Sequence, residues 1–236
     1  MKIYIFKYRW PEIEEMLLPG QTGYDREDIV NMVFKARLTA LLYNIRNGKY
    51  FGSKVLYEIH VIEYQHRGAP HAHIIVRFEN APKHNRFHEN YNNDILTADW
   101  IDKYISAKMP VIDENSSQDD KEYHQKVNDY MIHKCYSASR GGCLLKDGQC
   151  KRNYNKELIS ETHFDECGFP VYARPCEADL QVVPHCRALL MDCDSHIKVE
   201  YAASVYCAVY LYGYLFKGSK KDVMELNNLQ DTKKRS

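Results

Sequence analysis

Residues 57–78, with the sequence YEIHVIEYQHRGAPHAHIIVRF, constrain the fold more than any other stretch of the chain. Two runs rich in valine, isoleucine and aromatic residues flank a turn at Arg67-Gly68. Such runs favour β-strands, and a glycine-containing turn between them is typical of a hairpin. The stretch therefore predicts an antiparallel β-hairpin whose second strand opens with His71 and His73.

The two histidines of this hairpin are spaced to share one cation. Side chains alternate between the faces of a strand, so His71 and His73 project the same way, about 7 Å apart. By the same rule Glu63 and Gln65 share a face of the preceding strand. A carboxylate and two imidazoles leave open positions on Mg²⁺ or Mn²⁺, which a phosphate oxygen can fill. The alternative interpretation is that the histidines are ordinary polar residues on an exposed face and bind no metal.

The remaining sequence predicts helices around the hairpin. Apolar residues recur at helical spacing between residues 25 and 48, with Asp25 as the expected N-cap. We expect turns over residues 10–25 and an acidic loop over 113–122. Strands are expected at residues 1–6 and from Ile197, and helices over 90–109, over 122–133 and before Gly218. This mixture predicts an α+β domain with a central antiparallel sheet and flanking helices.

Composition narrows the class of protein. The chain has 236 residues, enough for a buried core, and equal numbers of basic and acidic residues, 32 each. Any surface for nucleic acid must therefore be local. No stretch approaches the roughly 20 apolar residues of a membrane span, and no signal peptide is recognisable. Eight cysteines in such a sequence predict an intracellular chain with reduced thiols, where cysteine–histidine clusters bind metal more often than they form disulfides.

A second candidate site lies in the stretch CAVYLYGYLFKG. Tyr210 and Tyr214 are four residues apart and Lys217 follows three later, so a helix would place all three on one face. A phenol, with a reference pKa of about 10, becomes a nucleophile when a metal polarises the phosphate and a cation favours the developing charge. The alternative is a tyrosine-rich helix packed in the core.

A third candidate site is a cysteine-rich segment that contains His133, Cys135, Cys143 and Cys150. Three thiolates and an imidazole form the ligand set of a structural zinc site, and buried free thiols are the alternative. Basic residues around the segment are the best local surface for phosphate contacts. They are Arg140, Lys146, Lys151, Arg152 and Lys156. The remaining cysteines are expected to be buried or free thiols: Cys167, Cys176, Cys186, Cys193 and Cys207.

These motifs together resemble a known family. The pattern Glu-x-x-x-Arg-Gly-x-Pro-His-x-His, from Glu63 to His73, is similar to the metal motif of HUH endonucleases. The wider stretch IEYQHRGAPHAHIIV resembles the Rep-like domain of Helitron transposases more closely still. Tyr-x-x-x-Tyr-x-x-Lys-Gly, from Tyr210 to Gly218, resembles the two-tyrosine motif of the same family. The cysteine-rich segment, the stretch DECGFPVYARP and the opening WPEIEEMLLPGQTGYDRED also resemble it.

The resemblance implies an HUH or Rep-like fold with a ferredoxin-like core. It implies one domain over residues 1–236, with residues 130–176 as an inserted Cys/His zinc-binding segment. Glu63, His71 and His73 would hold Mg²⁺ or Mn²⁺, with Gln65 as a further candidate. The partners would be single-stranded DNA at transposon ends and a helicase in cis or in trans, since the chain has no Walker loop of its own.

The resemblance also implies a mechanism. Tyr210 and Tyr214 would nick DNA through 5′-phosphotyrosine intermediates, helped by Lys217, and the protein would be intracellular and nuclear, without a membrane. One departure is IFKYR at residues 5–9, where the family has Phe-Thr-x-Asn-Pro. Because of this departure, one alternative is that the protein is catalytically inactive and only binds single-stranded DNA. A second alternative is a rolling-circle replication initiator of a virus or plasmid. A third is an interaction module in which the residues of both motifs serve only for packing.

Overall fold

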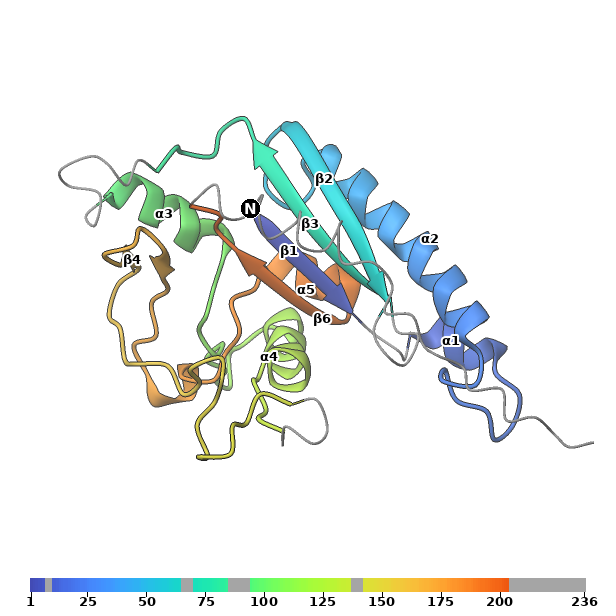
Figure 1. Cartoon of the computed structure of the whole chain (residues 1–236). Helices are drawn as coiled ribbons and strands as arrows, with labels where there is room; N and C mark the ends of the chain where they lie inside the picture. The colour runs from blue at the N-terminus through green and yellow to red at the C-terminus, as the bar shows by residue number, and fades with distance from the viewer. Residues whose placement is uncertain (7–9, 65–69, 85–93, 137–141, 204–236) are drawn as a thin grey trace, which may run out of the picture.

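The computed structural model describes residues 1–6, 10–64, 70–84, 94–136 and 142–203. The fold is α+β, as predicted, with a four-stranded antiparallel sheet in the order β2-β3-β1-β6 (Figure 1). The strands of this sheet are β1 (Lys2–Phe6), β2 (Val55–Tyr64), β3 (Pro70–Phe78) and β6 (His196–Glu200). A small second sheet pairs β4 (His163–Phe164) with β5 (Pro170–Val171).

Five helices occur in the described part of the chain. They are α1 (Pro11–Met16), α2 (Glu27–Arg46), α3 (Ile95–Tyr104), α4 (Gln118–Tyr130) and α5 (Arg187–Cys193). A 3₁₀ turn, η3 (Glu177–Asp179), lies between β5 and α5. None of the described helices combines the length and the apolar character needed to cross a membrane.

One face of the sheet carries the main core. Ile3, Ile74 and Ile197, from three neighbouring strands, are completely buried in one cluster with the apolar stripes of α2 and α5. Figure 1 shows α5 behind the sheet and α2 running along β2. Trp10 joins these helices, since its indole nitrogen donates to the Cys193 carbonyl at 3.2 Å. The covered face leaves the other face of the sheet for polar side chains.

The chain between residues 10 and 25, predicted as turns, contains the short helix α1. Pro11 occupies the first helical turn, where its missing N–H costs nothing, and Arg37 of α2 binds the Glu12 carboxylate at 2.7 Å. The predicted N-cap of α2 was also wrong, because the helix begins after Arg26. Asp25 instead accepts hydrogen bonds from the backbone and hydroxyl of Thr22, both at 2.7 Å.

The starts of α3 and α4 were set by caps that the periodicity did not reveal. The Asp94 carboxylate accepts from the Thr97 N–H at 3.1 Å, which starts α3. The Ser117 hydroxyl accepts from the Asp120 N–H at 3.1 Å, so α4 begins inside the predicted acidic loop. α3 ends at Tyr104, earlier than predicted, because the chain then pairs in an antiparallel bridge with His185.

A buried histidine links α4 to the segment before α5. His185 is completely buried, and its Nε2 lies 2.7 Å from the Tyr123 hydroxyl. Nδ1 lies 2.9 Å from the Val183 carbonyl, so Nδ1 carries the proton and Nε2 accepts from the tyrosine. Burial lowers the pKa of His185 to about 4 from 6.5.

We expect this histidine to make the fold sensitive to acid. The unfolded imidazole binds a proton at its ordinary pKa of 6.5, whereas the folded one does so only near pH 4, so protons favour the unfolded state as the pH falls through this window. The loss should be about 2 to 3 kcal/mol at pH 4. Urea unfolding from about pH 7 to 4 should show a shallower pH dependence for His185→Gln than for the surface control His60→Gln. Parallel pH profiles would contradict this assignment.

Candidate metal and nucleic-acid site

The polar face of the sheet carries the three predicted ligands of the hairpin, two of which, Glu63 and His73, are in contact. The register places Glu63 opposite His71 and Val61 opposite His73. Residues paired across an antiparallel ladder project from the same face, so the carboxylate and both imidazoles share it. Glu63 Oε2 lies 3.1 Å from His73 Nε2, which fixes the direction of both side chains.

Burial differs among these three side chains. The side chain of His73 is 5% exposed and that of Glu63 is 26% exposed. His71 is half-buried. One oxygen and two imidazoles on a single face form a donor set that suits a divalent cation with open positions for a phosphate. The same 3.1 Å contact is also a hydrogen bond that orients the His73 ring. Gln65 lies outside the described residues.

The Cys/His segment forms the tightest group of potential ligand atoms in the described part of the chain. His133 Nε2 lies 3.4 Å from Cys135 Sγ, 3.2 Å from Cys143 Sγ and 3.4 Å from Cys150 Sγ. All four ligand atoms lie within 4.8 Å of one another. Ligands at the corners of a zinc tetrahedron, with Zn–S of about 2.3 Å and Zn–N of about 2.0 Å, stand about 3.5 Å apart. The four predicted residues therefore fit one zinc ion.

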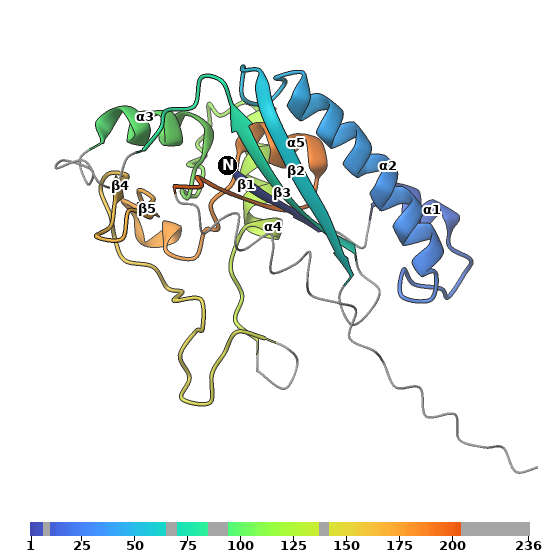
Figure 2. The same cartoon turned by 45° about the horizontal axis from the view of Figure 1, so that its top comes forward.

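Local backbone structure positions the three sulfurs. Figure 2 shows the segment between α4 and β4 as a loop that reaches away from the sheet. Within it a bridge pairs Leu144 with Cys150 around a turn at Gly148, whose φ of 84° suits glycine. Burial would raise the pKa of Cys150, but the backbone N–H groups of Tyr154 and Arg152 outweigh it and lower the pKa to about 7. The thiolate that a metal requires is thus favoured at this residue.

A comparison with protein families adds an independent observation. Residues 7–76 match the model of the Helitron helicase-like domain at the N-terminus. Over these residues the chain is similar to that domain. The match contains Glu63, His71 and His73, and it ends before the Cys/His segment and the tyrosine motif. No curated protein and no solved structure matches the chain.

The structure places the remaining predicted site residues as follows. Tyr210, Tyr214 and Lys217 lie outside the described residues, and so does Arg140. Lys146, Lys151 and Arg152 are exposed beside the Cys/His segment. Cys186 and Cys193 are buried, while Cys167 and Cys176 are exposed without a disulfide, as expected of thiols with no assigned role. Cys207 lies outside the described residues.

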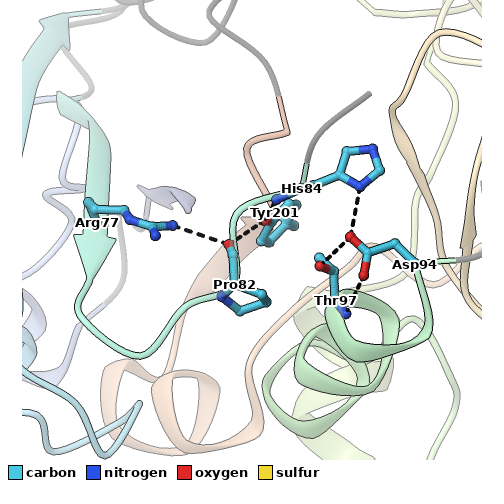
Figure 3. A network of polar contacts seen from close by, with 6 residues as sticks. All are labelled: Arg77, Pro82, His84, Asp94, Thr97 and Tyr201. Atoms are coloured by element: carbon cyan, nitrogen blue, oxygen red, sulfur yellow. Dashed lines mark hydrogen bonds and ion pairs between the residues drawn. The ribbon is translucent and has the colours of Figure 1, made fainter. Parts of the chain in front are cut away.

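A polar network missed by the sequence analysis anchors the chain where it leaves β6 (Figure 3). The Pro82 carbonyl accepts from the Tyr201 hydroxyl at 2.8 Å and from the Arg77 guanidinium at 3.3 Å. Beside it, His84 Nδ1 lies 3.1 Å from the Asp94 carboxylate that caps α3. The network ties the loop after β3 to the residues that lead toward the tyrosine motif.

Proposed function

We propose that the chain is an HUH endonuclease and strand transferase of a Helitron-type rolling-circle transposase. The observation that carries this proposal is the placement of Glu63, His71 and His73 on one sheet face, within the region that matches the Helitron family model. Residues 1–236 would form a single Rep-like domain with a ferredoxin-like core. Residues 130–176 would be its inserted segment, held by a structural zinc ion.

The proposed mechanism assigns a role to each group. Glu63, His71 and His73 would hold Mg²⁺ or Mn²⁺, which polarises the scissile phosphate when bound. The buried His73 ring, oriented by Glu63, keeps its position during the reaction. A tyrosine oxygen of Tyr210 or Tyr214 bonds to phosphorus and loses its proton, and the P–O3′ bond breaks. The products are a 3′-hydroxyl, once it has taken up a proton, and a 5′-phosphotyrosine.

The phosphotyrosine would make strand joining possible without ATP, because attack by a free 3′-hydroxyl reverses the first step. Two tyrosines allow two DNA ends to be held at one site. Lys217 would favour the negative charge that develops on the phenol oxygen. Unwinding of the duplex would require a helicase in cis or in trans, and the natural substrate would be single-stranded transposon ends.

We expect Tyr210→Phe and Tyr214→Phe to separate the first nucleophile from the second. A fluorescent single-stranded oligonucleotide is incubated with the protein and Mn²⁺, and labelled protein is detected after denaturation in SDS. The variant that lacks the attacking oxygen should lose the adduct by more than about a hundredfold, the range expected when a nucleophile is removed. EDTA should remove the adduct from the unaltered protein. Tyr43→Phe, at an exposed tyrosine of α2 outside the tyrosine motif, serves as a control.

Two competing functions predict different results in this assay. A catalytically inactive relative, suggested by the departure at residues 5–9, would bind the oligonucleotide and form no adduct under any metal condition. A viral or plasmid replication initiator would form the adduct with an origin hairpin in preference to transposon ends. An equal adduct yield with the double variant Tyr210→Phe/Tyr214→Phe would refute the assignment of the tyrosines.

A further inference from the structure

Lys156 is linked to the Cys/His cluster through the ring of Tyr154. Its Nζ donates to the Arg152 carbonyl at 3.2 Å and lies 5.1 Å from the centre of the Tyr154 ring. That ring stacks on His133 with centroids 4.0 Å apart and an interplanar angle of 18°. His133 belongs to the cluster and stacks on Tyr154, and Tyr154 contacts Lys156. The cluster therefore helps to fix the position of the Lys156 ammonium group.

Lys198 connects this charge to the sheet face that carries His73. Tyr4 of β1 pairs with His73 on one side and with Lys198 on the other. Side chains in one cross-strand row project from the same face, so His73 and Lys198 share a face two strands apart, about 10 Å. β6 also lies next to the start of the Cys/His segment, because Nδ1 of His196 in β6 is 2.6 Å from the carbonyl of Tyr130, three residues before His133.

Four basic side chains lie in this region of the described structure: Arg152, Lys156, Arg174 and Lys198. Arg174 is only 4% exposed and donates to two neutral carbonyls, of Tyr172 and Val182. Burial, and then the charges of Arg174 and Lys198, lower the pKa of Lys156. Arg174 and Lys198 repel the Lys156 ammonium, and the charges of Arg152, Lys156 and Lys198 all disfavour a proton on His133.

Two acids, Glu200 and Asp179, and the Cys150 thiolate of the cluster partly balance these cations. Glu200 lies 2.7 Å from Lys198 Nζ and 3.9 Å from Lys2 Nζ. The negative charge of Asp179 favours the charged form of Arg174. The Asp179 carboxylate is buried, however, and accepts a hydrogen bond from the Met109 N–H at 2.7 Å. A group of like charges held together by packing is stabilised by an anion, and lysine and arginine side chains are the usual partners of phosphate.

We propose that Arg152, Lys156 and Lys198 bind a backbone phosphate of single-stranded DNA that runs across the sheet from His73 toward the Cys/His cluster. The identity of the ligand rests on the proposed nuclease function. DNA on this path would place one phosphate at the hairpin histidines, and the basic side chains would hold the neighbouring nucleotides. The cluster would then serve to position a DNA contact as well as to stabilise its loop.

The test measures DNA affinity and covalent capture separately. Fluorescence anisotropy with an oligothymidylate gives Kd over a series of KCl concentrations for the unaltered protein, Lys156→Gln and Lys198→Gln. Each variant should bind about threefold to tenfold more weakly, and the slope of log K against log salt should fall by about 0.7. Lys156→Arg and Lys198→Arg retain the charge and should restore binding. The matched control is Lys35→Gln, an exposed lysine of α2.

The two proposals fail in different ways. Weaker binding with a reduced salt slope, together with normal adduct formation at saturating DNA, supports the phosphate path. Gln variants that bind like Lys35→Gln, with an unchanged salt slope, would overturn the path while adduct formation leaves the nuclease intact. If no adduct forms in any protein but the Gln variants still lose affinity and salt dependence, the path stands and the nuclease assignment falls.

Discussion

Replacing His73 with alanine is expected to abolish the metal-dependent adduct while single-stranded DNA still binds. The substitution removes an imidazole nitrogen that lies 3.1 Å from the Glu63 carboxylate, on the face that also carries His71. Loss of residues that merely support metal ligands already costs 10- to 100-fold, so loss of a ligand should reduce the adduct by more than about a hundredfold. Capture on an SDS gel and anisotropy on the same oligonucleotide measure the two effects.

The controls for this result must exclude a change in folding, because His73 is 4% exposed. His73→Gln fills most of the same space and should also lose the adduct. His60→Ala removes a histidine of β2 whose Nδ1 lies 2.9 Å from Glu58, outside the proposed ligand set, and should retain full activity. Thermal unfolding of all three variants reports on stability. Undiminished adduct in a folded His73→Ala protein would refute the metal site.

A substitution at Glu63 should weaken metal binding less than the loss of His73. Glu63→Gln keeps an oxygen that can contact His73 but removes the negative charge that attracts the cation. Adduct formation should therefore require a higher Mn²⁺ concentration, with a smaller change at saturation. A Glu63→Gln protein with an unaltered metal requirement would indicate that the 3.1 Å contact only orients the imidazole.

Local patterns predicted the paired strands of the hairpin and the common face of its three candidate ligands. The period-2 alternation around Glu63 and His71 is a property of any strand, and a short turn leaves few possible registers. The order of the strands could not be predicted in this way. β1 pairs with both β3 and β6, so Ile3 faces Ile74 on one side and Val199 on the other, pairings that join distant parts of the chain.

The grouping of the four Cys/His side chains was also predicted from residue type, because three cysteines and a histidine in a short segment match the ligand set of a structural zinc site. The charges that surround the cluster were only partly predictable. Arg152 and Lys156 are its neighbours in sequence, whereas Lys198 joins them only through the sheet. The Pro82–Tyr201 contact is likewise invisible to any sequence window, since it unites residues far apart in the chain.

The cluster leads to the second large expected effect. Cys143→Ser should reduce bound zinc from about one ion per chain to well below half and destabilise the segment between α4 and β4. The Cys143 sulfur lies 3.2 Å from His133 Nε2, and a serine hydroxyl is a much poorer zinc ligand. Apparent zinc affinities of small zinc domains are about 10 to 16 kcal/mol, so losing one of four ligands should cost several kcal/mol of local stability.

Metal analysis of the purified protein and protease susceptibility of the loop measure this effect. Cys167→Ser is the matched control, since Cys167 is an exposed thiol outside the cluster. Because His133 stacks on Tyr154, and Tyr154 supports Lys156, zinc removal should also weaken DNA binding. Hydrogen exchange should show increased opening of the loop in Cys143→Ser and unchanged protection in β1 and β3. Full zinc occupancy of Cys143→Ser would show that this sulfur is no ligand, and the link from the cluster to the DNA path would then have to rest on packing alone.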